Sequence, residues 1–384
     1  MHLRELRCFA FRNHPDTRLE LAPGLTVVVG RNGQGKTNLL EAVATLALTR
    51  SPRAGSLAEC IAWEAPASRV TGWAEGATGP LEVDCRLDRL PGNPERAVRR
   101  YSVNGAPRAA RAVLGLIPVV LFWPEDLALV KGPPEGRRRL LDIVLSQADP
   151  VYAETAVRFR RALEQRNALL RGSGPGGAAA GPLEAWTRAL VDHGAPMMAA
   201  RAALATALRP LVAFALAEAG EPATLELRYR PGLATEAVPP ASLADPATAA
   251  SALRAALQAT TGDERLRGTT VCGPHRDDLI LELDGRAARA FASQGQQRSI
   301  VLAMKTAEVR VLRQRLGTSP VLLLDDVFSE LDPLRQERLS ALLAGEGAEL
   351  QTLLTTAAVD AVPAAVHAGH QLVVERGQVR RIGG

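Results

Sequence analysis

Eight residues near the start of the chain, Gly30-Arg31-Asn32-Gly33-Gln34-Gly35-Lys36-Thr37, match the pattern G-x-x-x-x-G-K-[ST]. The β-branched run Leu25–Val29 precedes them, and a helical pattern begins at Asn38. In this strand–loop–helix setting, glycines let backbone N–H groups converge on phosphate oxygens at a helix N-terminus. Lys36 is expected to reach the β- and γ-phosphates, and Thr37 to offer a hydroxyl to Mg²⁺. The motif therefore predicts an α/β fold in which residues 30–38 bind a nucleoside triphosphate, ATP.

A second apolar run ends in two acidic residues, Asp325 and Asp326, which follow Val321–Leu324. A buried strand would hold Asp325 rigidly enough to bind Mg²⁺ directly or through water, and Asp326 would orient or deprotonate the attacking water. On its own the pair is also consistent with a plain strand terminus, but the phosphate loop favours the catalytic interpretation. About 290 residues separate Lys36 from Asp325. This separation predicts a large insertion in the nucleotide-binding domain.

The pattern between the two motifs indicates a helical insertion. From about Glu125 to Leu216 the sequence is rich in Ala, Leu and Arg, and one glycine-rich stretch, Gly172–Gly177, interrupts it. We expect that stretch to turn one long helix back against another. Strands resume at Leu279–Leu283, with Asp284-Gly285 as a turn. The predicted organisation is an α/β head at 1–130 and 266–384 with a helical arm at 131–265 between its halves.

Composition restricts the cellular setting. The 384 residues are 47% hydrophobic and 23% charged, no apolar run reaches the ~18 residues that span a bilayer, and the charged start is unlike a signal peptide. We therefore expect a soluble, cytoplasmic protein without a membrane partner. The net charge is +5, and residues 131–171 carry much of the excess, which suggests a surface that faces a polyanion. The four cysteines form no C-x-x-C pair, so neither a zinc site nor a disulfide framework is expected.

Ser293-Gln294-Gly295-Gln296 precedes another apolar helical run and resembles the S-G-G-Q signature of ABC-type ATPases, with Gln294 at the first glycine position. In that superfamily these amides, at a helix N-terminus, bind the γ-phosphate held by the opposite subunit. The resemblance implies that Ser293 to Gln296 bind ATP in an ATP-dependent homodimer. Ser329–Asp332 resembles the D-loop of the same interface. The alternative is an ordinary polar helix cap, which the order and spacing of the motifs disfavour.

Several segments together resemble the RecF family of recombinational DNA-repair proteins. They are Phe11-Arg12-Asn13, residues 35–42, Pro124–Leu127, Lys131–Pro133, Arg137-Arg138, Gly273–Asp278 and the motifs above. The resemblance implies an ABC/SMC-type P-loop ATPase head interrupted by a helical arm domain. It also implies ATP-dependent binding of double-stranded DNA at gaps or single/double-strand junctions, and weak DNA-dependent ATP hydrolysis. The family further implies RecR and RecO as partners in loading RecA.

The chain departs from general ABC chemistry in two places. No glutamine lies between Gln34 and Gln147, so Glu125 or Asp126 is a candidate to replace the Q-loop glutamine. Where a switch histidine would follow Asp326, the chain has Thr355 and Thr356. Their hydroxyls are able to hydrogen-bond phosphate or water, but unlike an imidazole they cannot take up a proton and become charged. Slow hydrolysis is expected, as suits a timed clamp. Three alternatives remain. The helical arm and the missing glutamine and histidine disfavour a transporter ATPase subunit. The short, glycine-broken arm disfavours a structural SMC-like head, and the Ser293 segment disfavours a small-molecule kinase.

Arginine segments are the expected contacts with DNA or a protein partner. They are Arg137-Arg138-Arg139 and the group Arg158, Arg160 and Arg161. For both segments a solvated helix face is an equal alternative. Only 4% of the residues are aromatic, which favours contact with the phosphate backbone over stacking on single-stranded bases. His275, beside Arg276 and Asp277, is expected to be a structural hydrogen-bonding residue.

Overall fold

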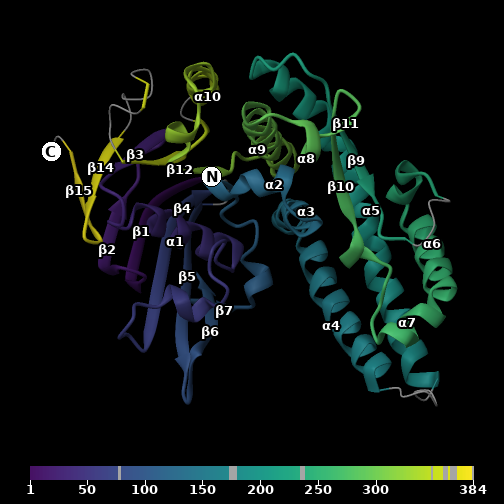
Figure 1. Cartoon of the computed structure of the whole chain (residues 1–384). Helices are drawn as coiled ribbons and strands as arrows, with labels where there is room; N and C mark the ends of the chain where they lie inside the picture. The colour runs from purple at the N-terminus through teal and green to yellow at the C-terminus, as the bar shows by residue number, and fades with distance from the viewer. Residues whose placement is uncertain are drawn as a thin grey trace. The chain divides into compact units, whose positions relative to one another are not determined.

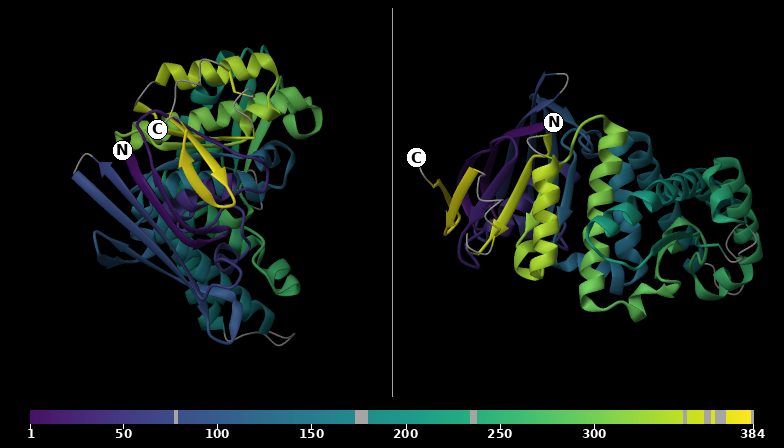
Figure 2. Two further views of the ribbon diagram at one scale, coloured as in Figure 1. Left: turned by 90° about the vertical axis from the view of Figure 1, so that its left-hand side faces the viewer. Right: turned by 90° about the horizontal axis from the view of Figure 1, so that it is seen from above.

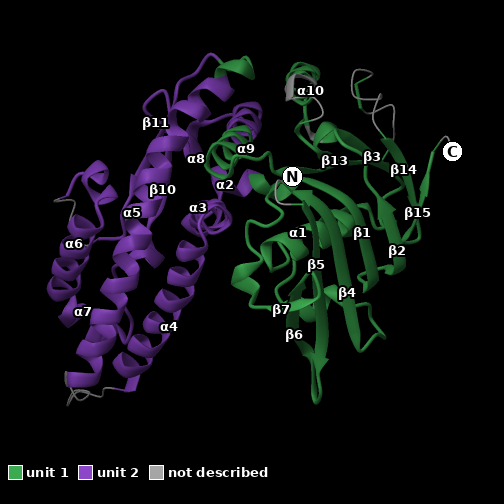
Figure 3. Ribbon diagram, turned by 180° about the vertical axis from the view of Figure 1, so that it is seen from behind, with its two compact units in different colours: residues 1–126, 217–221, 305–384 green, residues 127–216, 222–304 purple. Residues whose placement is uncertain are grey.

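The computed structural model describes residues 1–76, 79–172, 180–233, 238–346, 349–357, 362–363 and 370–382. Contacts group the chain into two compact units (Figure 3). Unit 1 comprises Met1–Asp126, Ala217–Glu221 and Lys305–Gly384, and unit 2 comprises Leu127–Leu216 and Pro222–Met304. The chain thus forms the first part of unit 1, then unit 2 with a short return to unit 1 at residues 217–221, and finally completes unit 1 from Lys305 onward.

The first sheet of unit 1 has the strand order β2-β1-β4-β5-β6-β7, and its neighbouring strands are antiparallel (Figure 1). Buried Leu6 and Cys8 alternate with Arg7 and Phe9 along β1, the pattern of a sheet with one covered face. The strands are β1 (His2–Phe11), β2 (His14–Glu20), β4 (Ala67–Gly76), β5 (Gly79–Leu90), β6 (Asn93–Val103) and β7 (Ala106–Arg108).

The second sheet of unit 1 has the order β15-β14-β3-β13-β12-β8, with every pair parallel except β14 and β15. All five residues of β12 are buried, which explains why this strand is a continuous apolar run instead of an alternating one. The strands are β3 (Leu25–Val29), β8 (Val119–Phe122), β12 (Val321–Asp325), β13 (Thr352–Thr356), β14 (His370–Glu375) and β15 (Gln378–Arg381). The predicted strands at 25–29 and 321–324 are confirmed.

Helix α1 (Lys36–Leu48) packs against strands of both sheets and is buried over almost its whole length, as its apolar sequence requires. The carboxyl ends of β3, β8, β12 and β13 meet at one edge of the parallel sheet, where α1 begins. In Figure 2 the yellow hairpin β14–β15 lies beside the purple N-terminal strands, consistent with the pairing of β14 with β3. Unit 1 also contains α10 (Pro333–Glu346), η1 (Leu57–Cys60), η2 (Ala110–Ala112), most of η3 (Pro124–Leu127), η6 (Val327–Glu330) and the part of α9 (Gln294–Leu316) from Lys305 onward.

Unit 2 is mainly helical, with one three-stranded sheet in the order β11-β10-β9. Its helices are α2 (Ala128–Lys131), α3 (Pro134–Ala148), α4 (Pro150–Gly172), α5 (Ala180–Glu218), α6 (Pro246–Ala259), α7 (Thr261–Arg267), α8 (Ala288–Phe291) and the start of α9 (Gln294–Leu316). Its strands are β9 (Leu225–Arg230), β10 (Asp278–Leu283) and β11 (Arg286–Ala287), and its 3-10 turns are η4 (Pro240–Ala244) and η5 (Pro274–Arg276). The glycine-rich turn expected after Gly172 lies outside the described residues.

The two units differ from the predicted domain limits. The helical unit extends to Met304 instead of ending near residue 265, because β10 pairs with β9 and thereby joins residues 278–283 to it. The boundary near residue 130 falls at Asp126. The three-part division at 130 and 265 stays a prediction.

Buried arginine–carboxylate pairs tie the elements of unit 2 together. Arg137 on α3 donates to both carboxylate oxygens of Asp278 on β10, at 2.8 and 3.1 Å. Arg201 on α5 binds Asp142 and Asp277 and is itself buried. Because Arg137 is buried and engaged in this way, the expectation that it contacts DNA or a partner is wrong, and it stabilises unit 2 instead. Arg138 is half-buried and donates to the Asp277 carbonyl oxygen at 2.7 Å. A contact of Arg138 or Arg139 with DNA or a partner stays a prediction.

One helix among the described residues, Gly181–Glu218 of α5, is long and apolar enough to cross a membrane, contrary to the expectation that no such run exists. Half of the most apolar 18-residue stretch of this helix is buried inside the protein, and the helix contains the buried arginine Arg201. Core helices of soluble proteins meet the same criteria.

The four cysteines are free thiols in buried positions, and burial raises the pKa of Cys8, Cys60 and Cys85 to about 12.

Candidate functional site

The phosphate loop connects β3 to α1 and has the backbone geometry its glycines suggest. Gly33 and Gly35 adopt positive φ values of 80° and 113°, a conformation in which most side chains are strained. The Lys36 ammonium donates to the carbonyl oxygens of Gly30 and Arg31 at 2.5 and 3.2 Å, and burial lowers its pKa. The lysine is thus folded over the loop, where a phosphate group would offer stronger acceptors than these carbonyls.

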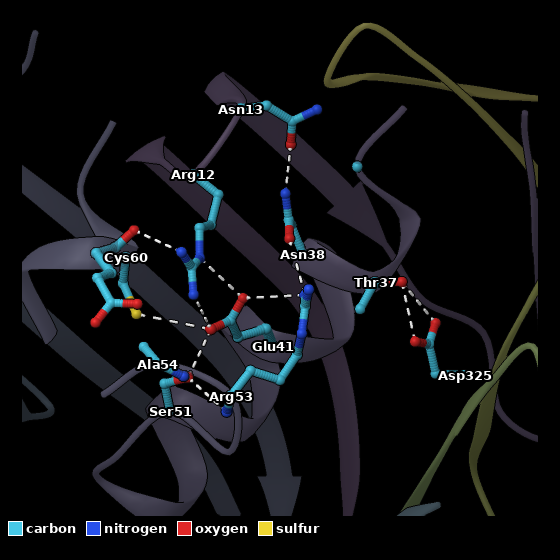
Figure 4. A network of polar contacts seen from close by, with 12 residues as sticks. Arg12, Asn13, Thr37, Asn38, Glu41, Ser51, Arg53, Ala54, Cys60 and Asp325 are labelled. Carbon is cyan, nitrogen blue, oxygen red and sulfur yellow. Dashed lines mark hydrogen bonds and ion pairs between the residues drawn. The ribbon is translucent and has the colours of Figure 1, made fainter. Parts of the chain in front are cut away.

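The acidic pair lies at the end of β12, beside the start of α1. The Thr37 hydroxyl donates to the carboxylate of Asp325, with both oxygens at 2.9 Å (Figure 4). Burial raises the pKa of Asp325, and hydrogen bonds from Thr355 and Thr37 oppose that rise. Asp326 is half-buried and has the left-handed backbone conformation, with φ at 49°. The structure thus brings together Lys36, Thr37 and Asp325 from distant parts of the sequence, as predicted.

The turn of the C-terminal hairpin supports the phosphate loop. The Arg376 amide donates to Gln34 Oε1 at 2.7 Å, and the Gly377 amide donates to the Gln34 carbonyl oxygen at 3.0 Å. Beneath the loop, the buried imidazole of His14 lies between the carbonyl oxygens of Gly35 and Gly377, at 3.0 and 2.9 Å. Burial lowers the pKa of His14. The loop is therefore held from both termini of the chain.

A second network anchors helix α1 one turn beyond the loop (Figure 4). Arg12 donates to both oxygens of the fully buried Glu41 carboxylate, at 3.0 and 2.7 Å, and to the Glu59 carbonyl oxygen at 2.8 Å. Ser51 donates to the same carboxylate at 2.6 Å, and Arg53 lies 3.6 Å from it. The Asn38 amide reaches Asn13 Oδ1 at 2.9 Å. These contacts give Arg12 and Asn13 a positioning role beneath the loop.

Ser293, Gln294, Gly295 and Gln296 belong to unit 2, whereas the phosphate loop and the acidic pair belong to unit 1. Ser293 caps α9 reciprocally: its amide donates to Gln296 Oε1 at 3.0 Å, and the Gln296 amide donates to its hydroxyl at 3.2 Å. Ser293 and Gln294 are both exposed, and Gly295 and Gln296 are half-buried. The helix N-terminus that the signature motif requires is present.

Of the two candidates to replace the missing Q-loop glutamine, Asp126 is held by hydrogen bonds and an ion pair, and Glu125 is accessible to solvent. Asp126 accepts from the Trp123 amide at 2.9 Å and lies 3.6 Å from the Lys305 ammonium. Burial raises the pKa of Asp126, which the positive charge of Lys305 opposes. Glu125 is exposed. Asp126 is therefore tied into a buried ion pair, and Glu125 is the accessible carboxylate of the two.

The other residues named from the sequence have the following contacts and exposure in the structure. His275 Nε2 contacts the Thr270 carbonyl oxygen at 3.1 Å, which agrees with a structural role. Ser329 donates to the Asp326 carbonyl oxygen at 2.8 Å, and Asp332 caps α10 through the Arg335 amide at 3.0 Å. Arg158, Arg160 and Arg161 lie on α4 and are all exposed, so their contact with DNA or a partner stays a prediction.

Reasoning from the sequence did not find the roles of Glu41, His14 or Gly377. Glu41 carried a signal: it is an acidic residue within the apolar stretch Leu39–Ala44, and a buried carboxylate requires a partner. The contact of Gln34 with Arg376 spans 342 residues and left no pattern from which it could be inferred.

The chain is similar to known proteins over its whole length. Residues 2–378 match the family model described as RecF/RecN/SMC N terminal domain. A DNA replication and repair protein RecF of Frankia alni is 42% identical, over 99% of this chain and 100% of the relative. Another, from Moorella thermoacetica, is 38% identical over 100% of this chain and 97% of the relative.

Solved structures agree. A structure of the recombination mediator protein RecF-ATP in the RecFOR pathway has a TM-score of 0.88 and 27% identity, over 100% of this chain and 98% of that one. An Smc head domain from Pyrococcus furiosus, at 14% identity over 99% of this chain and 96% of that one, has a TM-score of 0.56 and shows the shared fold alone. From the motifs, the P-loop head and this full-length similarity, the chain belongs to the RecF family of DNA replication and repair proteins.

Proposed function

We propose that this protein is an ATP-dependent double-stranded DNA-binding protein of recombinational repair. ATP binds to the phosphate loop of one copy and to the Ser293 segment of a second copy, and so joins two heads that clamp DNA. Slow, DNA-dependent hydrolysis to ADP and phosphate then releases it. The clamp acts at gaps or single/double-strand junctions and supports RecA loading with RecO and RecR. The observation that carries the proposal is the convergence of Lys36, Thr37 and Asp325 at one edge of the parallel sheet.

The residues of unit 1 have distinct tasks in ATP binding. The backbone amides of Gly30 to Gly35 surround the phosphates, with the Arg31, Asn32, Gln34 and Asn38 side chains at the rim, and Lys36 binds the β- and γ-phosphates. Asp326 orients or deprotonates the attacking water. Support for ATP as the ligand comes from the similar structure of RecF-ATP.

The site suits a magnesium ion. Mg²⁺ prefers oxygen ligands and binds through one or two carboxylates together with substrate phosphates. Thr37 Oγ1 and the Asp325 carboxylate are such ligands and lie 2.9 Å apart, with Asp325 buried and Thr37 half-buried. We assign both residues to Mg²⁺, which when bound would neutralise charge on the phosphates.

Two substitutions separate ATP binding from dimerisation. Lys36→Ala removes the ammonium that binds the phosphates, so ATP binding, ATP-induced dimers and DNA clamping should be lost together. Ser293→Arg places a bulky cation where the second copy would present its triphosphate, so dimers should be lost while ATP binding stays near the wild-type value. Sedimentation with and without ATP, and then with a duplex oligonucleotide, measures both. ATP-induced dimers of Ser293→Arg would refute the composite site.

A further inference from the structure

Thr355 lies at the end of β13, directly beside the acidic pair. It is fully buried, and its register partner on the neighbouring strand β12 is Asp325. β13 pairs on its other side with β3, the strand that leads into the phosphate loop. Thr355 is therefore held rigidly between the strands that carry the two halves of the nucleotide site.

The hydroxyl of Thr355 is used in both of its hydrogen-bonding roles. It donates to Asp325 Oδ1 at 2.6 Å, and it accepts from the Asp326 amide at 3.1 Å. An amide N–H only donates, so the single hydroxyl proton is directed to the Asp325 carboxylate. One side-chain atom thus fixes the carboxylate of one acidic residue and the backbone of the next.

The backbone of Asp326 needs such support. Its φ of 49° and ψ of 30° are in the left-handed region, which residues other than glycine occupy only where their surroundings hold them. Its amide donates to the carbonyl oxygen of Thr355 as well as to the hydroxyl, both at 3.1 Å. Ser329 donates to its carbonyl oxygen at 2.8 Å. Thr355 and Ser329 therefore hold this residue from its two sides.

We propose that Thr355 is a positioning residue that holds Asp325 and Asp326 in the arrangement that binds Mg²⁺-nucleotide. This inference rests on the proposed function. It replaces the expectation that Thr355 binds phosphate or water, because its hydroxyl is already committed to the acidic pair. Hydrogen bonds to a carboxylate are among the strong ones, so the loss of this one should be measurable.

The experiment measures nucleotide affinity with and without Mg²⁺. Thr355→Val removes the hydroxyl at nearly constant volume and should weaken binding of a fluorescent ATP analogue about tenfold or more in Mg²⁺, but by less than twofold in EDTA. Thr355→Ser keeps the hydroxyl and should restore the Mg²⁺-dependent affinity. Thr352→Val, in the same strand, is the matched control, since the Thr352 hydroxyl donates to the Leu350 carbonyl oxygen, at 3.4 Å, and not to the acidic pair.

Three results would overturn the proposal: wild-type affinity of Thr355→Val in Mg²⁺, an equal loss in EDTA, and no recovery in Thr355→Ser. If Thr355→Val does not fold, Thr355→Ala tests the same point. As a coupling test, Thr355→Val should have less effect in an Asp325→Asn background than in the wild type. A wild-type protein that binds no nucleotide would contradict the proposed function instead, so the two failures are distinguishable.

Discussion

At the scale of single residues, Gly377 shows how much the phosphate loop depends on the other end of the chain. A Cβ atom at Gly377 would lie 2.0 Å from the Asn13 carbonyl oxygen, and its φ is +75°. Gly105 has the same φ in a hairpin turn but nothing within 4 Å. A side chain at either glycine would be strained by the positive φ, but only at Gly377 would it also clash with a neighbouring atom.

We expect Gly377→Ala to displace the hairpin turn from Gln34. The left-handed conformation alone costs about 1–2 kcal/mol in a residue other than glycine, and Gly105→Ala should show that loss of stability only. Gly377→Ala should lose more and should also weaken nucleotide binding. Urea denaturation and nucleotide titration of both variants measure these effects. Equal behaviour of the two variants would show that the hairpin does not support the loop.

His275 predicts a pH dependence of stability. Burial, together with the charges of Arg276, Arg138 and Arg201, lowers its pKa to about 4, whereas the unfolded value is about 6.5. Between these values the unfolded chain binds a proton that the folded protein does not, so stability falls as the pH falls from about 6.5 to about 4. From pH 7 to pH 5 the loss is about 2 kcal/mol. Denaturation of His275→Gln at both pH values should lack this part of the slope.

At the scale of elements, unit 2 depends on buried ion pairs between helices. Arg166 on α4 donates to Glu264 on α7 at 2.6 Å, to Thr270 at 2.8 Å and to Thr187 on α5 at 3.0 Å. The Arg166 and Glu264 side chains are 3% and 0% exposed. Removal of one partner leaves a buried charge unpaired, and such changes cost about 3–5 kcal/mol.

We therefore expect Arg166→Met to destabilise unit 2 by about 3 kcal/mol or more. Arg158 on the same helix pairs with Glu154 at the surface, so Arg158→Met should cost less than about 1 kcal/mol. Denaturation followed by circular dichroism, together with hydrogen exchange of α4 and α7, measures both. Similar losses in the two variants would contradict the assignment of Arg166 as the tie between these helices.

The elements also show which features the sequence could predict. The strands at 25–29, 119–122 and 321–325 were predictable because buried parallel strands are continuous apolar runs. The helices at 150–172 and 180–218 carried a clear helical pattern. The pairing of β9 with β10 was not predictable, because the two strands are about 50 residues apart and only tertiary contact selects their register. Arg137 was misassigned for the same reason, since its partner Asp278 is 141 residues away.

At the scale of the whole molecule, the proposed catalytic set predicts weak ATP hydrolysis. Asp326 has no histidine at the position that would follow it in ABC enzymes, and the hydroxyl of Thr355 serves the acidic pair. We expect turnover with DNA to stay below the enzyme median of ~10 s⁻¹. A phosphate-release assay with duplex DNA measures it. A faster rate would mean that another group, such as the exposed Glu125, contributes to hydrolysis.

DNA binding by the whole molecule should be strongly dependent on salt. If about five phosphates are neutralised, the logarithm of affinity falls with a slope near −4.5 against the logarithm of salt concentration, and several hundred-fold between 50 and 200 mM. Arg160→Ala with Arg161→Ala should make the slope shallower by about 0.9 for each phosphate that the variant no longer neutralises. Arg86→Ala is the control, because Arg86 pairs with Asp88 at 2.8 Å on the first sheet of unit 1. An unchanged slope in the double variant would leave this face of α4 as a solvated surface, and an affinity insensitive to salt would contradict backbone contact altogether.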